Sequence, residues 1–522
     1  MIACSAARIT FYSKSIIVLM QALVKKCIQI AILVTPMYKR PTKQQMLRQR
    51  ITMLVVMVFS ILFLVTAVIL SILGYRLDGD NGRLEQGALV QFDSLPSAAR
   101  ISVDGQPTSL QTPNKRSVIA GVHSFMFEKQ NYRTWSKTLD LAAGTLTWLD
   151  YVRLVPNQLK PGVVREYDTV SAVKASPDVR TMLVQTDSSR PVFERVDIRD
   201  RDVRTNTLVL PAELYAQSTD ETATHRFTMD SWDVGGRYIL VRHDVAETSE
   251  WLVVDTESVG RSQNVSRLLG ITVTDLKFSG TSGSVLFGLT DNILRKIDLS
   301  SATISRALVP NVTSFSLYDT NIITYVGRDV SSGLPVAGIY RDGDAEPVVL
   351  RTASTPETAL AVATTRHYND RYLAIAEDRS VSVLRGNYPT SKSAVANLEV
   401  VEEFETTGAI SVFSFSPDGD YLLAQSGARF ASYEVEYDRL NRAALSDDAA
   451  AVHTLRWLDE AYVWTVIDGM LSTREFDGNY AHELLPAVVG FDVTISQNGR
   501  YVYAVTQTPS GYALQRVTMI LE

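Results

Sequence analysis

The chain from Val163 to Glu522 repeats one pattern of short strands and tight turns, and this repeat limits its fold more than any other feature. Within each unit, apolar and polar residues alternate over short runs that are separated by Asp-Gly, Gly-Gly or Asn-Gly turns. Such alternation predicts half-buried strands joined by hairpins, and no amphipathic pattern is long enough to predict a helix. Comparable units begin at Val170, Phe227, Val273, Val312, Ala359, Ile410, Ala451 and Val489.

Units of four strands at a spacing of roughly 35 to 60 residues are typical of propeller blades. The repeated turn is clearest at Ser416, Pro417, Asp418 and Gly419. With this turn the segment resembles the WD40-like and TolB-like β-propellers, which implies blades arranged around a central channel. Residues 163–522 contain eight units by this count, or seven if the weaker units from Val312 and Ala359 are divided wrongly.

The two ends of this segment predict how the ring closes. The last unit ends after its third strand, Tyr512 to Leu521. The segment VVREYDT at Val163 to Thr169 matches VVEEFET at Val400 to Thr406 in four of seven positions, and the second copy occupies the place of an outermost strand. We therefore expect residues 163–168 to supply the fourth strand of the last blade and to remove an exposed sheet edge.

Residues 87–156 predict a separate small β domain. Short alternating runs at Ala88–Phe92, Arg100–Val103, His123–Phe127 and Lys137–Leu141 are separated by turn residues. Several turn markers follow one another in the order found in the PEGA domain, a small β-sandwich of bacterial and archaeal surface proteins, which the segment resembles. The resemblance implies a surface or spacer module without catalysis. The matching residues are Pro96, Asp104, Gly105, Thr112, Pro113, Gly121 and Tyr132.

A run of 23 residues without a charged side chain, Ile51 to Leu73, predicts a transmembrane helix. Its apolar core is too long for a cleaved signal peptide, and no small-residue cleavage pattern follows it. We assign residues 51–75 to an uncleaved signal anchor, residues 1–50 to a basic head, and residues 76–86 to a linker. The head carries nine Lys or Arg and no acidic residue. The positive-inside rule therefore predicts a cytoplasmic N-terminus and an extracytoplasmic C-terminal body.

Residues 1–36 allow two interpretations. Ile16 to Val34 is apolar but interrupted by Lys25 and Lys26, as in an interfacial helix. Alternatively, translation begins at Met37 and this stretch is not made. Both cysteines, Cys4 and Cys27, lie here, so the body has no thiol for a disulfide or a metal site.

Charge and motifs narrow the function of the body. From residue 77 onward, 41 basic residues face 57 acidic ones, a net charge of −16, so we expect no nucleic-acid partner. The six histidines are scattered, and no zinc-protease, hydrolase or nucleotide-binding motif occurs. We therefore predict no catalytic residue, no cofactor and no metal.

The complete prediction is an all-β ectodomain, a PEGA-like sandwich plus a propeller of seven or eight blades, on a single transmembrane helix. We expect a binding or scaffold protein of the cell envelope whose partners are the lipid bilayer and an envelope protein or glycan. An extracytoplasmic propeller enzyme acting on envelope glycan or peptide is the alternative, because propeller active sites are built from single residues on different blades. A receptor that signals inward would need a further partner, since the head contains no domain.

Overall fold

The structure of the protein, a computed structural model, describes residues 42–72, 75–77, 84–199, 201–218, 222–446 and 453–521. The chain divides into two compact units, residues 1–87 and residues 88–522. The doubtful stretch 1–36 with both cysteines, the end of the predicted span at Leu73, and Glu522 lie outside the described residues.

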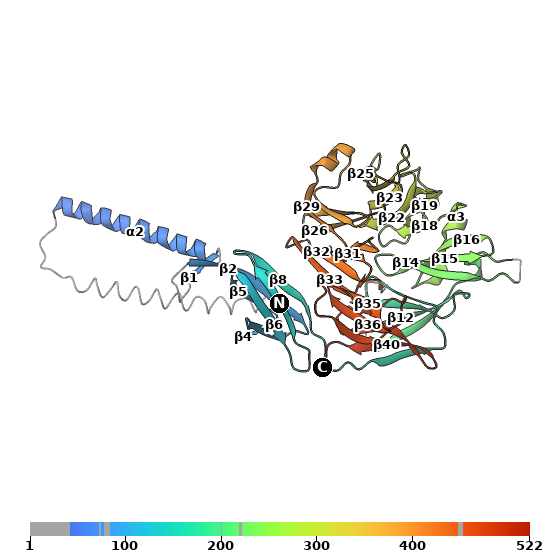
Figure 1. Ribbon diagram of the computed structural model, residues 1–522, viewed down its shortest axis with the longest axis horizontal. Coiled ribbons are helices and arrows are strands. Elements are labelled where there is room, and N and C mark those ends of the chain that lie inside the picture. The colour runs from blue at the N-terminus through green and yellow to red at the C-terminus, as the bar shows by residue number, and fades with distance from the viewer. Residues whose placement is uncertain are drawn as a thin grey trace. The chain divides into compact units, whose positions relative to one another are not determined.

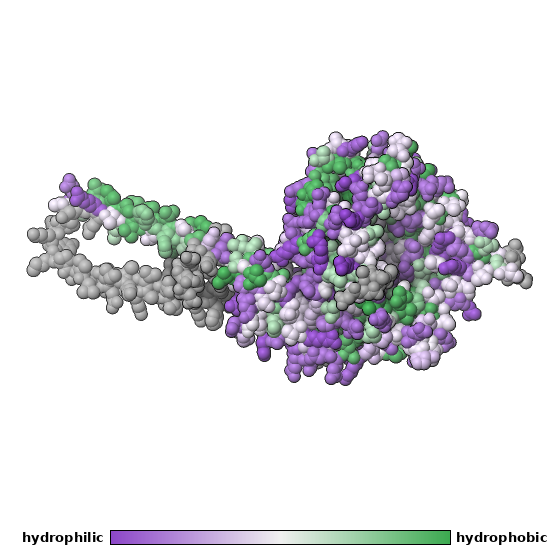
Figure 2. Space-filling view, in the orientation of Figure 1, coloured by the Kyte–Doolittle hydropathy of each residue, from purple (hydrophilic) through white to green (hydrophobic). Residues whose placement is uncertain are grey.

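The first unit contains one long apolar helix, α2 (Lys43–Ile72). Within it, Met46–Leu70 has a mean hydropathy of 3.0 and is long and apolar enough to cross a membrane. Its side chains are exposed in the unit, and Figure 2 shows apolar residues along its surface. Tyr75, which the sequence pattern assigned to the span, instead begins strand β1 (Tyr75–Leu77), and β1 pairs with the start of β2 (Leu84–Leu95).

The second unit begins with a small β domain of two sheets. In one sheet, β2 pairs with β5 (Asn114–Ile119) and with β8 (Leu146–Arg153). The other has the order β4 (Gln106–Gln111), β3 (Arg100–Val103), β6 (Gly121–Glu128) and β7 (Trp135–Leu141). Alternate residues of both sheets, such as Phe92 and Phe125, share one buried core, which makes the domain a sandwich.

The rest of the second unit is a β-propeller of eight four-stranded antiparallel sheets, which we call blades 1 to 8 in chain order. Figure 1 shows the blades following one another from green through yellow to red. Blade 1 consists of β10 (Ala172–Ala175), β11 (Thr181–Gln185), β12 (Val192–Asp197) and β13 (Arg204–Val209), and blade 2 of β14 (Arg226–Trp232), β15 (Tyr238–Val245), β16 (Thr248–Asp255) and β17 (Gln263–Asn264). Blade 3 consists of β18 (Asp275–Phe278), β19 (Val285–Thr290), β20 (Ile293–Asp298) and β21 (Thr303–Ile304), and blade 4 of β22 (Val312–Tyr318), β23 (Ile322–Arg328), β24 (Pro335–Arg341) and β25 (Val348–Thr352). Blade 5 consists of β26 (Leu360–His367), β27 (Asp370–Glu377), β28 (Ser380–Arg385) and β29 (Glu399–Glu405), and blade 6 of β30 (Val412–Phe415), β31 (Tyr421–Ser426), β32 (Arg429–Glu434) and β33 (Arg439–Ala444). Blade 7 consists of β34 (Arg456–Trp457), β35 (Tyr462–Ile467), β36 (Met470–Glu475) and β37 (His482–Pro486), and blade 8 of β38 (Thr494–Ile495), β39 (Tyr501–Thr508), β40 (Gly511–Thr518) and β9 (Gly162–Tyr167).

Short helices connect some of these strands. They are η1 (Ala212–Leu214), η2 (Val259–Arg261), α3 (Val265–Leu269) and η3 (Lys392–Asn397).

The apolar residues of the blades lie at the seams between them. Successive residues of a strand point to opposite faces, so Leu422 packs toward blade 5 and Leu423 toward blade 7. Because both faces of a blade are covered, its second strand is largely apolar rather than alternating, as in β19 (VLFGLT) and β35 (YVWTVI). One apolar cluster joins each neighbouring pair of blades, including blade 8 with blade 1, so the ring is closed.

The predicted closure of the ring is confirmed. β9 pairs antiparallel with β40, with Tyr167 opposite Tyr512 and Gly162 opposite Arg516. The first segment of the propeller therefore completes its last blade, and the fold-class prediction is confirmed with eight blades.

The strand order gives the propeller two different faces. In a four-stranded meander, the connection between the first two strands and the connection between the last two emerge at the same edge of the sheet. We call the face formed by these connections the turn face. The Ser-Pro-Asp-Gly turn and the pockets described below lie on it.

Candidate functional site

The Ser-Pro-Asp-Gly turn of blade 6 is held by its own side chains. Ser416 Oγ donates to Asp418 Oδ1 at 2.6 Å, and the amide of Gly419 donates to the carbonyl of Ser416 at 3.0 Å. Gly419 has a φ of +91°, and a Cβ there would collide with Thr365 Oγ1 of blade 5. Pro417 is exposed beside them. The motif therefore sets the turn and the seam between two blades.

Blades 1 and 8 build the same turn with different residues. Ser176 Oγ donates to Asp178 Oδ1 at 2.5 Å, and Ser496 Oγ bonds Asn498 Oδ1 at 2.8 Å. Val179 occupies the glycine position of blade 1 with a φ of +52°, which a β-branched residue rarely adopts. The recurrence explains why this motif was the strongest sequence signal, and it identifies the motif as structural.

The predicted marker residues of the small domain lie at several turns and at the start of one strand. Pro96, Thr112 and Pro113 lie close together, after β2 and after β4. Thr112 Oγ1 accepts from the amide of Ala99 at 3.0 Å and shares a hydrogen bond of 2.6 Å with Ser94 Oγ. Ser94 Oγ also reaches the carbonyl of Pro96 at 2.8 Å. Pro113 is exposed next to this network. These contacts tie the chain after β2 to the end of β4.

The hairpin between β3 and β4 turns at Asp104 and Gly105, which have φ values of +52° and +72°. Asp104 Oδ2 lies 2.7 Å from His123 Nδ1, and this hydrogen bond is the largest cause that lowers the pKa of Asp104. Gly121 adopts a φ of +128° at the start of β6. Tyr132 is different: its hydroxyl accepts from the amide of Leu521, so it connects the small domain to the last described residue of the propeller.

The centre of the contact between the small domain and the propeller is a buried cation. Lys137 Nζ lies 2.9 Å from Glu475 Oε2 and 2.7 Å from Asp477 Oδ2, both on the turn face of blade 7. The three side chains are 8%, 1% and 6% exposed. Desolvation opposes the charge, but Tyr151 and the two carboxylates raise the pKa of Lys137 well above its usual value. Trp135 Nε1 donates to Glu475 as well.

Further contacts extend this junction over blades 7 and 8. Arg133 Nη1 donates to His482 Nδ1 at 2.8 Å, and Arg153 Nη2 pairs with Asp459 at 2.6 Å. Burial, together with the charge of Arg133, lowers the pKa of His482 to about 4. Val155 joins the apolar cluster between blades 7 and 8. The junction is thus both apolar and charge-paired, which favours a fixed arrangement of the two domains.

A small cavity of about 180 Å³ lies where strand β8 meets the turns of blades 5 and 6. His367 is held at 2.6 Å by a carboxylate on each ring nitrogen, Asp420 at Nδ1 and Glu436 at Nε2. Burial and the neighbouring Asp418 raise the pKa of Asp420 to about 6. This is the strongest concentration of acid–base groups at a described pocket.

A second group of ionisable residues lies in blade 2, where His243 and Glu250 are buried and His225 is half-buried. His225 Nδ1 lies 2.9 Å from His243 Nε2, and His243 Nδ1 lies 2.9 Å from Glu250 Oε1. Asn264 donates to the other oxygen of Glu250 at 2.6 Å. The sequence did not reveal that these two histidines meet. Among the described residues, however, no group of three or more His, Cys, Asp or Glu could hold a metal ion.

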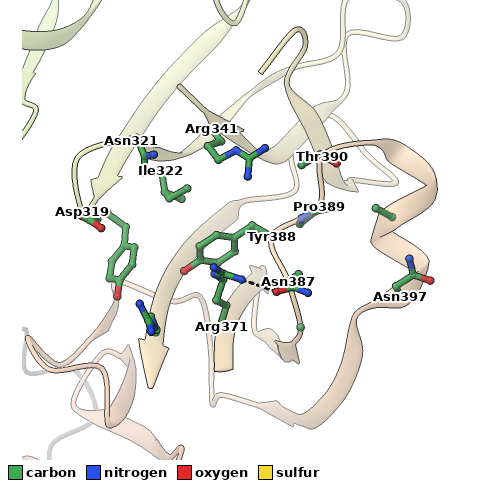
Figure 3. Close-up of a pocket in the computed structure, with 14 residues that line it drawn as sticks. Asp319, Asn321, Ile322, Arg341, Arg371, Asn387, Tyr388, Pro389, Thr390 and Asn397 are labelled. Carbon is green, nitrogen blue, oxygen red and sulfur yellow. Dashed lines mark hydrogen bonds between the residues drawn. The ribbon is translucent and has the colours of Figure 1, made fainter. Parts of the chain in front are cut away.

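The largest described pocket, about 810 Å³, opens on the turn face between blades 4 and 5. Three arginines line it: Arg341 from the end of β24, Arg366 from the end of β26 and Arg371 from the start of β27. We call it the arginine pocket. Figure 3 shows Arg371 and its neighbour Asn387 beside the ring of Tyr388, with Arg341 and Asn321 on the side of blade 4.

Comparisons with known proteins matched one family model and several solved structures. Residues 89–157 match the PEGA domain family. Similar solved structures include Hsv2 of Kluyveromyces lactis, with 11% identity, a TM-score of 0.38 and coverage of 68% of this chain and 99% of that one. The β-propeller domain of Myceliophteria thermophila Cps50 (Swd1) has 11% identity, a TM-score of 0.35 and coverage of 69% and 99%. No match was found among curated proteins.

This chain carries a PEGA domain and a β-propeller. The predicted marker residues of the two domains lie in turns, except Gly121 at the start of β6 and Tyr132, and they do not gather at one pocket. The residues that do gather, Arg366 and Arg371 in the arginine pocket and Lys137 in the PEGA–propeller junction, were not singled out from the sequence. A basic residue in a repeat of short strands carries no local signal of its surroundings.

Proposed function

We propose that this chain is a membrane-anchored binding protein of the cell envelope, which holds a PEGA domain and a propeller as one rigid unit outside the cytoplasm. The observation that carries the proposal is the buried junction at Lys137. A flexible spacer would not need a desolvated ion pair, because such pairs cost solvation energy that only a fixed geometry recovers. The PEGA domain then sets the direction in which the propeller's turn face points.

The anchoring part of the proposal rests on α2 and on charge. The exposed apolar surface of Met46–Leu70 favours a bilayer as its surroundings. The nine basic residues before the span and the net charge of −16 beyond residue 77 favour an extracytoplasmic body. The same negative charge argues against a nucleic-acid partner.

Cysteine labelling tests the membrane arrangement. The full chain, with Cys4 and Cys27 replaced by serine, receives one new cysteine, either Lys115→Cys in the PEGA domain or Gln44→Cys before the span. A membrane-impermeant maleimide should label Lys115→Cys in intact cells and Gln44→Cys after lysis alone. Recovery of the chain in an alkaline-washed membrane pellet is the second expected result. The reverse labelling pattern, or a chain released by the wash, would contradict the proposal.

The alternative, an enzyme of the envelope, is favoured by one observation, the cavity with His367, Asp420 and Glu436. A carboxyl group with a pKa near 6 beside a histidine is suited to general acid–base catalysis. The cavity of about 180 Å³ is smaller than most substrate sites, which favours a structural ion-pair network instead. Incubation of the full chain with purified envelope glycan decides between the two: cleavage that Asp420→Asn abolishes would establish the enzyme, and intact glycan would remove its support.

A further inference from the structure

We propose that the arginine pocket binds an acidic saccharide, a sugar unit whose carboxylate or phosphate pairs with Arg366 and Arg371. This inference rests on the envelope-binding function proposed above and names the class of its ligand.

The three arginines of the pocket differ in their partners. Arg341 is neutralised by Asp344, at 2.7 Å. Arg366 donates to the carbonyl of Tyr368 at 2.8 Å, and Arg371 donates to the amide oxygen of Asn387 at 2.5 Å. Neither Arg366 nor Arg371 forms an ion pair with a carboxylate of the described residues.

Two other arginines on the turn face are paired with a carboxylate, Arg199 with Asp197 and Arg237 with Asp255. Two unpaired guanidinium groups on a body with a net charge of −16 therefore mark a place that attracts an anion. One carboxylate, Asp319, also lines the pocket, so the three arginines keep a positive excess there. Guanidinium groups bind carboxylate and phosphate oxygens in pairs of hydrogen bonds, which gives the site its selectivity for oxyanions.

The outer wall of the pocket is an insertion in blade 5. Residues 386–398 connect β28 to β29, whereas residues 435–438 suffice for the equivalent connection in blade 6. The insertion includes η3 and contributes Asn387, Tyr388, Pro389, Thr390 and Asn397 to the lining (Figure 3). Insertions in a repeat protein gather on its binding face, since the repeat itself does not need them.

The lining suits a sugar better than a bare anion. Tyr388 stands beside the guanidinium group of Arg371, whose Cζ lies 5.5 Å from the centre of the ring. Its hydroxyl donates to the carbonyl of Thr365 at 3.0 Å, which fixes the position of the ring. Tyr318, Asn321 and Asn387 add an aromatic ring and amide groups. Aromatic faces pack on sugar rings, and amides exchange hydrogen bonds with hydroxyl groups.

The size of the pocket agrees with this class of ligand. A volume of about 810 Å³ lies within the range of sites for small organic molecules and far exceeds the needs of a single oxyanion. The pocket also lies on the same face as the PEGA junction, so a ligand chain can leave it across the turn face. An acidic peptide would satisfy the arginines but would make little use of the tyrosines and amides.

A binding titration tests the inference with the full chain in detergent micelles. The probes are a glucuronate-containing tetrasaccharide, the same tetrasaccharide with its carboxyl groups reduced to alcohols, a glycerol-phosphate oligomer with sugar substituents, inorganic phosphate and oligoglutamate. We expect saturable binding of at least one acidic saccharide, weakened about tenfold or more by carboxyl reduction or by loss of the phosphate. Which of the two binds identifies a carboxylate or a phosphate as the natural anion. Rising salt should weaken the binding.

Matched variants assign the binding to the pocket. Arg366→Gln and Arg371→Gln should each weaken it about tenfold. Arg204→Gln, which removes the same charge from an exposed position on the outer strand of blade 1, should leave it unchanged. Thermal unfolding of each variant verifies that the chain is folded.

Several outcomes would overturn the inference. They are no binding of either acidic saccharide, equal binding by folded Arg366→Gln and Arg371→Gln, and equal affinity for inorganic phosphate or for oligoglutamate. Cysteine labelling and membrane retention are separate measurements, so a failure of saccharide binding is distinguishable from a failure of the envelope function.

Discussion

Replacement of Lys137 by methionine is the most direct test of the rigid junction. Methionine keeps most of the aliphatic length of the side chain but removes the charge, so the loss of packing is small. Glu475 and Asp477 then remain at 1% and 6% exposure with their cation gone. Removal of one partner from a buried ion pair costs about 3–5 kcal/mol, because the remaining charge is left uncompensated. The cation–π contacts of Lys137 with Tyr151 and Phe476, at 4.9 and 4.6 Å, are lost as well.

Urea unfolding of the full chain in detergent micelles measures this loss. Tryptophan fluorescence reports on the junction because Trp135 is buried there and donates to Glu475. Lys115→Met is the matched control, since Lys115 is exposed on β5, and we expect it to change stability by less than about 0.5 kcal/mol. The triple variant Lys137→Met, Glu475→Gln, Asp477→Asn removes all three charges and should recover part of the stability.

Two results would refute this reasoning. If Lys137→Met lies within about 1 kcal/mol of the original chain, the ion pairs contribute little and the junction is not held by charge. If the triple variant is as unstable as the single variant, the cost comes from packing and not from unpaired carboxylates.

Three further predictions concern the pH dependence due to His482, the seam between blades at Gly419 and the turn at Val179. His482 has a pKa of about 4 in the folded chain against an ordinary value of 6.5. Its contribution of about 3 kcal/mol to the free energy of unfolding is therefore present above pH 6.5 and is lost as pH falls toward 4. His482→Gln should flatten the pH dependence of the unfolding free energy measured across this range. Gly419→Ala should destabilise the propeller by more than about 2 kcal/mol in thermal unfolding, because its Cβ collides with Thr365. Gly105→Ala, which also has a positive φ but nothing within 4 Å of its Cβ, should cost less. Equal losses of stability in the two variants would contradict the role of Gly419 in the seam. Val179→Asn should raise the unfolding free energy by roughly 1 kcal/mol, since asparagine tolerates a φ of +52° better than valine, and a loss of stability would show that the valine packing matters more.

The fold was predictable because each of its determinants repeats or lies close along the chain. Alternation and turn residues are local, and eight copies of them reinforce one another. Even the ring closure had a local signal, the similarity of Val163–Thr169 to Val400–Thr406, which identified β9 as an outermost strand. The same local patterns gave the PEGA domain, since its markers are turn residues that follow one another in sequence.

The junction had no such signal. Lys137 and Glu475 are separated by 338 positions, and each is an ordinary charged residue of a short strand. Whether such a charge faces water or a buried partner depends on where the PEGA domain docks on the ring. That is a property of two surfaces, and no single segment contains it.

The arginine pocket was predictable in part, more than the junction and less than the fold. Neighbouring blades place the turns of consecutive repeats side by side, so Arg341 and Arg371 line one pocket although they belong to different units. A motif search within one unit therefore misses the pair. What the sequence does contain is the departure from the repeat: blade 5 uses residues 386–398 where blade 6 uses residues 435–438. An added segment that builds no strand must be retained for another reason, and here it forms the wall of the largest described pocket. Shortening this segment to the length found in blade 6 should therefore abolish saccharide binding while the eight blades still fold, whereas loss of the fold would show that the insertion serves the seam between blades 4 and 5.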